Sequence, residues 1–77
     1  SVMITWIATV VQLYKPAPGL LQLFLENSTL WHDVTVPIDC GINFEVGDII
    51  QMVTDGFYYI SISVPGKGEY KWQHTYR

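Results

Sequence analysis

Apolar and polar side chains alternate with a period of two over much of this chain, and turn residues interrupt the alternation about every eight to twelve positions. Residues 57–64 show it most clearly: a face carrying Phe57, Tyr59, Ser61 and Ser63 alternates with a face of tyrosine, isoleucine and valine side chains. β-Branched and aromatic residues are dense, and no long stretch repeats at the 3.6-residue period of a helix. Because neighbouring side chains of a strand point to opposite faces of a sheet, the pattern predicts an all-β fold.

The chain of 77 residues has the length of one domain, and we expect residues 1–77 to form a single β domain. Its turn residues divide it into about seven short strands of a small antiparallel sandwich or barrel, two architectures that the pattern does not distinguish. The strongest hairpin signal is Asp55-Gly56, which has apolar alternation on both sides. The expected strands cover residues 2–14, 20–25, 30–36, 42–44, 49–53, 57–64 and 69–76.

The first expected strand is apolar on both faces, which is typical of a strand that is central in a sheet or covered by a partner. Hydrophobic residues make up 49% of the chain and charged residues 14%, against about 25% charged in a typical protein. A small domain exposes much of its surface, so this composition predicts that a partner covers part of it, and we expect a homo-oligomer. In a regular strand Val2, Ile4, Trp6 and Val10 share one face, and Met3, Ile7, Val11 and Leu13 share the other.

Residues capable of catalysis or metal binding are few and scattered. His32 and Asp33 are adjacent, so a strand places them on opposite faces, where they are poorly placed to form a proton relay. The candidate metal ligands lack the paired spacing of a structural zinc site; they are His32, Asp39, Cys40 and His74. The lone cysteine is typical of a small buried hydrophobe, with an intermolecular disulfide as the alternative. We therefore expect neither an enzyme nor a cofactor nor a metal site.

Residues 67–77 interleave cations with aromatic rings, as single-stranded nucleic-acid binders do. The period of two separates these groups, which predicts an aromatic core face and a solvated basic face. Residues 1–66 carry one lysine against six carboxylates, and this net charge of −5 would repel a polyanion. Nucleic acid is therefore not an expected partner. Lys67, Lys71 and Arg77 fall on one face of this segment, and Tyr70, Trp72, His74 and Tyr76 on the other.

Three aromatic residues fall on faces that are otherwise polar, and they are the candidate ligand-binding residues. Trp31 shares its face with Asp33 and Thr35, and Phe57 and Tyr59 share theirs with serines. A flat apolar ring flanked by hydrogen-bonding groups suits a sugar ring or a peptide, so the expected ligand is a carbohydrate or a protein. The alternative is that these rings pack inside a doubly covered sheet or against another copy.

The compartment is indicated only by a short motif. Asn27-Ser28-Thr29 fits the N-glycosylation acceptor pattern in an expected loop, which favours an extracellular or virion-associated setting. The apolar opening, residues 2–11, is too short for a membrane-spanning helix and is interrupted by threonines, so membrane insertion is not expected.

Short segments resemble three different families. Residues 44–52, followed by residues 55–58, resemble the middle of an SH3 domain. Residues 11–15, together with the Gly47-Asp48 strand, are similar to the second half of a tumour-necrosis-factor-like or C1q-like jelly roll. Residues 44–77 resemble the later strands of a galectin. Each resemblance covers half the chain or less, and no functional residue is carried over from any of them.

The sequence thus indicates a non-enzymatic β domain that works by binding. The leading hypothesis is a recognition module that holds a carbohydrate or protein ligand through Trp31, Phe57 and Tyr59. The alternative is a structural subunit of a homo-oligomeric viral or secreted assembly, which the low charge and the doubly apolar first strand favour.

Overall fold

The computed structural model describes residues 2–29 and 31–73, and within them the chain is all-β, as the alternation predicts. Six strands occur in this part of the chain, and they contain most of the segments expected from the pattern. They are β1 (Ile4–Tyr14), β2 (Leu20–Glu26), β3 (Trp31–Pro37), β4 (Ile49–Thr54), β5 (Tyr59–Val64) and β6 (Gly68–Lys71).

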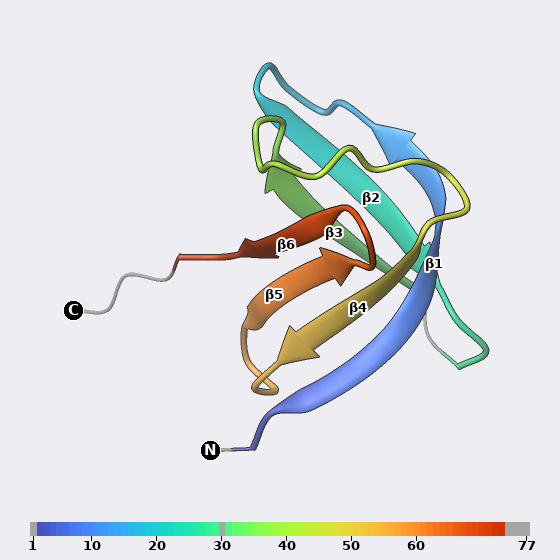
Figure 1. Ribbon diagram of the computed structural model, residues 1–77, viewed down its shortest axis with the longest axis vertical. Helices are drawn as coiled ribbons and strands as arrows, with labels where there is room; N and C mark the ends of the chain where they lie inside the picture. The colour runs from blue at the N-terminus through green and yellow to red at the C-terminus, as the bar shows by residue number, and fades with distance from the viewer. Residues whose placement is uncertain (1, 30, 74–77) are drawn as a thin grey trace.

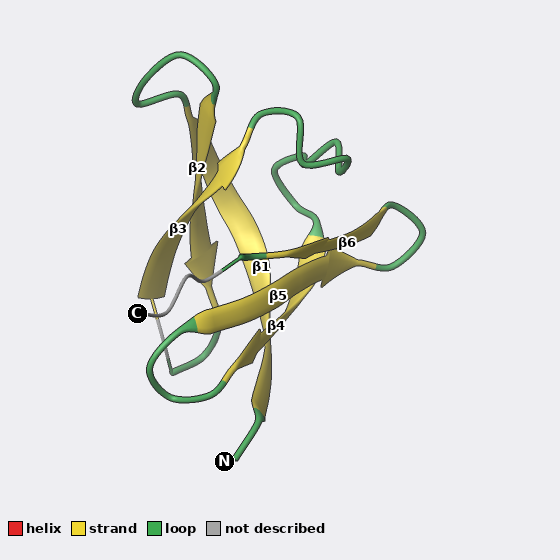
Figure 2. Ribbon diagram, turned by 90° about the vertical axis from the view of Figure 1, so that its left-hand side faces the viewer, coloured by secondary structure: helices red, strands yellow, loops and turns green. Residues whose placement is uncertain are grey.

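The strands form one antiparallel sheet in the order β3-β2-β1-β4-β5-β6, which curls into a half-barrel (Figure 1). β1 is shared by two groups of strands: residues 4–9 pair with β4, and residues 9–14 pair with β2. The two groups run at an angle to each other, with the curve of β1 between them (Figure 2). β3 and β6 are therefore the two edges of the sheet.

The inner face of the curled sheet holds the hydrophobic core. Each of β1 to β5 contributes two buried hydrophobic side chains at alternate positions, as the period of two requires. The loop before β4 adds two more. The buried core residues are Ala8, Val10, Leu23, Leu25, Val34, Val36, Ile42, Phe44, Ile50, Met52, Ile62 and Val64.

Two β-bulges change which face the following side chains occupy. In β1 the register skips Val11, so Leu13 lies opposite Leu23 and packs against the core, whereas Ile7 stays exposed. The expectation that Leu13 shares a face with Ile7 and Val11 is therefore wrong. In β5 the register skips Ile60, and Tyr59 consequently packs against the core. The expectation that Tyr59 stands on the serine face is wrong for the same reason, since one inserted residue inverts the alternation.

Residues 42–44 form a loop, not the strand expected there. Ile42 and Phe44 are nonetheless buried in the core. The alternation here therefore indicates correctly which side chains are buried, although the segment forms no hydrogen-bonded strand. The loop is held by Lys67, whose Nζ donates to the Asn43 carbonyl (3.0 Å) and contacts Glu45 Oε1 (2.6 Å) and Asp48 Oδ2 (2.9 Å). We call Lys67, Glu45 and Asp48 the lysine clasp. It ties the β5–β6 turn to the loop that enters β4.

The hairpin signal at Asp55-Gly56 is confirmed. Thr54 pairs with Tyr59, and the turn between them places Gly56 at φ 93°, a conformation that favours glycine. The Asp55 carboxylate accepts hydrogen bonds from the backbone N–H groups of Phe57 and Tyr58, each at 2.8 Å. This hairpin carries Phe57 out into solvent.

The C-terminal segment follows its expected pattern as far as the structure describes it. Tyr70 and Trp72 pack against the core, whereas Lys71 is exposed. His74, Tyr76 and Arg77 lie outside the described residues. The residues that the structure describes contain no helix with the length and apolar character needed to cross a bilayer.

The lysine clasp should make stability depend on pH at both extremes. The hydrogen bond from Lys67 lowers the pKa of the Asp48 carboxyl from its ordinary 3.8. The stability that the ionised Asp48 contributes to the fold is therefore fully present above pH 3.8 and is lost as pH falls through the lowered pKa. Contacts with Glu45 and then Asp48 raise the pKa of Lys67 from 10.5, so its contribution is present below pH 10.5 and is lost as pH rises through the raised pKa.

We expect Lys67→Met to lower the urea midpoint at pH 7, and the difference from wild type to shrink as pH falls below 3.8. Lys71→Met is the matched control, because Lys71 is exposed and has no ion pair within the described residues. Urea unfolding followed by circular dichroism at several pH values measures both variants. A difference that stays constant with pH would show that the clasp does not act through its charges.

Candidate functional site

Aromatic side chains gather on the inner face near the start of β1. Trp6 of β1 stacks on His32 of β3, with ring centroids 4.9 Å apart and an interplanar angle of 23°. The Tyr59 hydroxyl lies 3.2 Å from His32 Nδ1, and the two rings meet edge to face. These contacts link β3 with β5, two strands that are not neighbours in the sheet.

The same cluster continues to the edge of the sheet. Trp72 lies next to Tyr59, with centroids 5.8 Å apart, and Tyr70 meets Trp72 edge to face at 5.4 Å. The Trp72 indole N–H donates to the Thr35 carbonyl of β3 over 3.1 Å. We call the contacts of His32, Tyr59, Trp72 and Thr35 the aromatic seam, because side chains here join the two edges of the half-barrel.

A hollow of about 300 Å³ opens beside the aromatic seam, and we call it the aromatic pocket. It brings together residues from β1, β3, the β4–β5 hairpin and β5. Phe57 stands at its rim with 90% of its surface exposed, whereas Trp6, His32 and Tyr59 are partly buried. Trp6, His32, Thr54, Gly56, Phe57, Tyr58 and Tyr59 line the pocket.

No Asp, Glu, Lys or Arg side chain of the described residues lines the aromatic pocket. Burial, with a smaller contribution from the Asp33 carboxylate, raises the pKa of Tyr59 above its ordinary 10.0, so the phenol is neutral at physiological pH. Within residues 2–29 and 31–73, Trp6 Nε1 and His32 Nε2 have no hydrogen-bond partner. The pocket therefore offers ring faces and hydrogen-bonding groups, and no carboxylate, ammonium or guanidinium group of the described residues lines it.

The three candidate residues from the sequence do not form one site. Phe57 and Tyr59 lie together in the aromatic pocket, but Trp31 is on the outer face of β3, with 60% of its surface exposed. Its ring lies 5.7 Å from that of Phe24, and its indole N–H donates to Glu26 Oε2 over 3.2 Å. A ligand-binding role for Trp31 stays a prediction, and it concerns a separate surface.

Sequence reasoning did not select Trp6 or His32. The alternation in residues 30–36 does place His32 on the inner face with the buried Val34, opposite to Trp31. Nothing in the pattern, however, indicates that His32 meets Trp6 and Tyr59, which lie 26 and 27 positions away along the chain. That meeting depends on the curl of the sheet.

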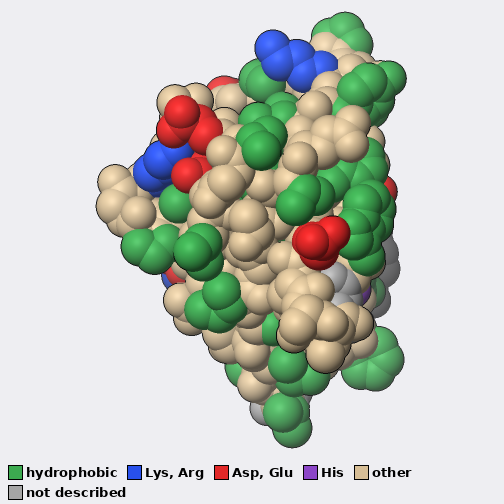
Figure 3. Space-filling view, turned by 90° about the vertical axis from the view of Figure 1, so that its right-hand side faces the viewer, with side chains coloured by type: hydrophobic (Ala, Val, Ile, Leu, Met, Phe, Trp, Pro, Cys, Tyr) green, Lys and Arg blue, Asp and Glu red, His purple; other side chains and the backbone are tan. Residues whose placement is uncertain are grey.

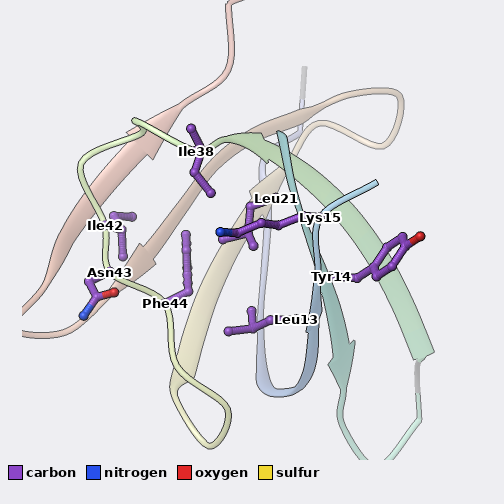
Figure 4. A pocket seen from close by; sticks show the side chains of 8 residues that line it. All are labelled: Leu13, Tyr14, Lys15, Leu21, Ile38, Ile42, Asn43 and Phe44. Carbon is purple, nitrogen blue, oxygen red and sulfur yellow. The ribbon is translucent and has the colours of Figure 1, made fainter. Parts of the chain in front are cut away.

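A second hollow, of about 500 Å³, lies toward the other end of β1, and we call it the apolar pocket (Figure 4). Its walls come from the end of β1, from β2 and from the loop before β4. In the close-up, Lys15 extends toward the hollow while the Tyr14 ring points away from it. Leu13, Tyr14, Lys15, Leu21, Ile38, Ile42, Asn43 and Phe44 line this pocket.

Other chemically active residues are dispersed. Asp33 lies on the face opposite to His32, where Gln22 Nε2 donates to its carboxylate over 2.7 Å. Cys40 is half-buried against the core, and its thiol donates to the Ile42 carbonyl over 3.7 Å. The described residues contain no group of three or more His, Cys, Asp or Glu side chains that could hold a metal ion.

The Asn27-Ser28-Thr29 motif shapes the turn between β2 and β3. The Asn27 side-chain oxygen accepts from the backbone N–H and the hydroxyl of Thr29, at 3.0 and 3.2 Å. The Asn27 amide nitrogen donates to the Ile7 carbonyl over 2.9 Å. The motif thus holds the hairpin against β1 in the unmodified chain.

Comparisons with protein-family models, with curated proteins and with solved structures found no match to this chain. The resemblances to three families therefore receive no support from relatives, and the pocket geometry is the basis for assigning a function.

Proposed function

We propose that this domain is a non-enzymatic recognition module that binds an uncharged carbohydrate in the aromatic pocket. The observation that carries the proposal is the lining of the pocket, which combines aromatic rings from four segments with hydrogen-bonding groups and, among the described residues, no Asp, Glu, Lys or Arg side chain. One face of a sugar ring presents C–H groups that stack on an aromatic ring, and its edge presents hydroxyls. Indole, imidazole and hydroxyl groups can hydrogen-bond to those hydroxyls.

The size of the pocket favours a small ligand. Its volume of about 300 Å³ is at the lower end of the range of about 300–1,000 Å³ for small-molecule sites. A stable protein partner covers about 800 Å² on each side, which is a larger surface than this hollow offers. A carbohydrate is therefore the leading ligand class, and a protein or peptide is the alternative.

Phe57 supports the proposal through its exposure. A phenylalanine with 90% of its surface in water gains nothing from burial in the free domain, although a covered aromatic ring contributes strongly to binding. The carboxylate of Asp55 fixes the hairpin that holds this ring at the pocket rim. A bound sugar would cover the ring without rearranging the core.

We expect Phe57→Ala to weaken carbohydrate binding by about tenfold while leaving the urea midpoint unchanged, because the ring is exposed in the free domain. Trp31→Ala is the matched control, since it removes an exposed ring on the other face. A glycan array selects the probe oligosaccharide, and isothermal titration calorimetry of wild type and both variants measures its affinity.

The two variants separate the outcomes. Loss of affinity in Trp31→Ala alone would move the site to the outer face of β3 and contradict the assignment to the aromatic pocket. If no sugar on the array binds, and if a peptide binds the wild type but not Phe57→Ala, the protein-ligand alternative is favoured.

A second candidate function, a structural subunit of a homo-oligomeric assembly, is favoured by exposed aliphatic side chains along the start of β1. Met3 and Ile7 expose 59% and 56% of their surfaces. Residues 4–8 pair with β4 but not with β2, so one backbone edge of this half-strand has no neighbouring strand among the described residues. On the side of the molecule that β1 faces, hydrophobic side chains lie between separate groups of charged side chains (Figure 3). Apolar surface with low charge is what subunit contacts use.

If this second function holds, Ile7→Glu should convert an oligomer to monomers, because the new carboxylate would be buried at the contact. Thr35→Glu, on the exposed face of the distant β3, is the matched control and should leave the oligomer intact. Sedimentation velocity over a wide concentration range measures both. A wild-type monomer at all concentrations would remove this candidate.

A further inference from the structure

The apolar pocket has the walls of a binding site for an aliphatic group. Leu13 and Leu21 are partly buried on one side of it, and Ile42 and Phe44 reach it from the core on the other. Its volume of about 500 Å³ lies within the range of about 300–1,000 Å³ for small-molecule sites. Water in a hollow with such walls is readily displaced by hydrocarbon.

One cation stands at the pocket without an anion. Lys15 has no ion pair within the described residues and extends toward the hollow (Figure 4), whereas Lys67 contacts two carboxylates. No Asp or Glu side chain of the part described lines this pocket. The chain has a net charge of −3 and therefore repels anions overall. Close to the unpaired Lys15 ammonium, however, an anionic group is attracted.

The loop that forms one wall contains backbone N–H groups that no other described group pairs. The backbone N–H groups of residues 41–44 have no hydrogen-bond partner within residues 2–29 and 31–73. The Asn43 carbonyl, in contrast, already accepts from Lys67. A carboxylate accepts hydrogen bonds and donates none, so the Lys15 ammonium and unpaired backbone N–H groups are the kinds of partner that it needs.

We propose that the apolar pocket binds a small carboxylic acid with an aliphatic chain. The chain lies among Leu13, Leu21, Ile42 and Phe44, and the carboxylate pairs with Lys15. The C-terminus of a peptide is a poorer occupant, because each of its backbone N–H groups would leave water and need an acceptor, whereas an alkyl chain needs none. This site is independent of the aromatic pocket, which shares none of its lining residues.

The probe is sodium decanoate below its micelle concentration, titrated into the ¹⁵N-labelled domain and followed by amide chemical shifts. We expect saturable shifts at residues 41–44, Leu13 and Leu21. Lys15→Gln should weaken binding about fivefold, which is the effect of one partly exposed ion pair. Lys71→Gln removes an exposed lysine of β6 that does not line the pocket, so it should leave the affinity unchanged, as should Phe57→Ala.

Decan-1-ol and an N-acetylated tripeptide ending in leucine test the ligand class. Weaker binding of both supports the proposal. Equal affinity for decanol, or no effect of Lys15→Gln, would overturn the role of the carboxylate. Tighter binding of the peptide would overturn the aliphatic acid as the occupant. Shifts that do not saturate, or that spread along the exposed residues of β1, would overturn the site itself.

Discussion

The half-barrel is joined across its open side by side chains, and the hydrogen bond from the Trp72 indole to the Thr35 carbonyl is the central contact. β3 and β6 are the edges of the sheet, and the described residues form no backbone ladder between them. The hydroxyl of Tyr59 and the ring of His32 add a second link from β5 to β3. Because rings rather than a strand fill this gap, the inner face stays accessible beside them, and the aromatic pocket lies there.

This form of closure explains why the two pockets differ. Toward the start of β1, amphipathic aromatic side chains cover the inner face. Their apolar ring atoms are partly buried, and their polar atoms stay available for hydrogen bonds. Toward the end of β1, the loop that includes Ile42 and Phe44 covers the core with aliphatic and phenyl groups, and the lysine clasp fixes that loop. One pocket therefore suits a polar ligand with flat apolar faces, and the other suits hydrocarbon.

The sequence predicts the parts of this fold that depend on local pattern. Alternation places His32 and Trp31 on opposite faces, and Asp55-Gly56 locates the hairpin. The alternation predicts the wrong face for Leu13 and Tyr59. Val11 and Ile60 are inserted residues that invert the alternation, and nothing in the composition of these segments indicates the insertions. The sequence predicts only those residues of the candidate site that lie close together along the chain. Phe57 and Tyr59 follow one turn, whereas Trp6 and His32 reach them only through the strand order and the curl.

The indole N–H signals of the three tryptophans report separately on the surfaces in question. Trp6 lines the aromatic pocket, Trp31 Nε1 donates a hydrogen bond to Glu26 on the outer face, and Trp72 Nε1 donates to the Thr35 carbonyl in the aromatic seam. A ¹H–¹⁵N spectrum recorded while adding an oligosaccharide selected on a glycan array is the most direct measurement. If the aromatic pocket is the site, the Trp6 signal moves and saturates while that of Trp31 stays in place. A saturating shift of Trp31 with an unchanged Trp6 signal would contradict the assignment.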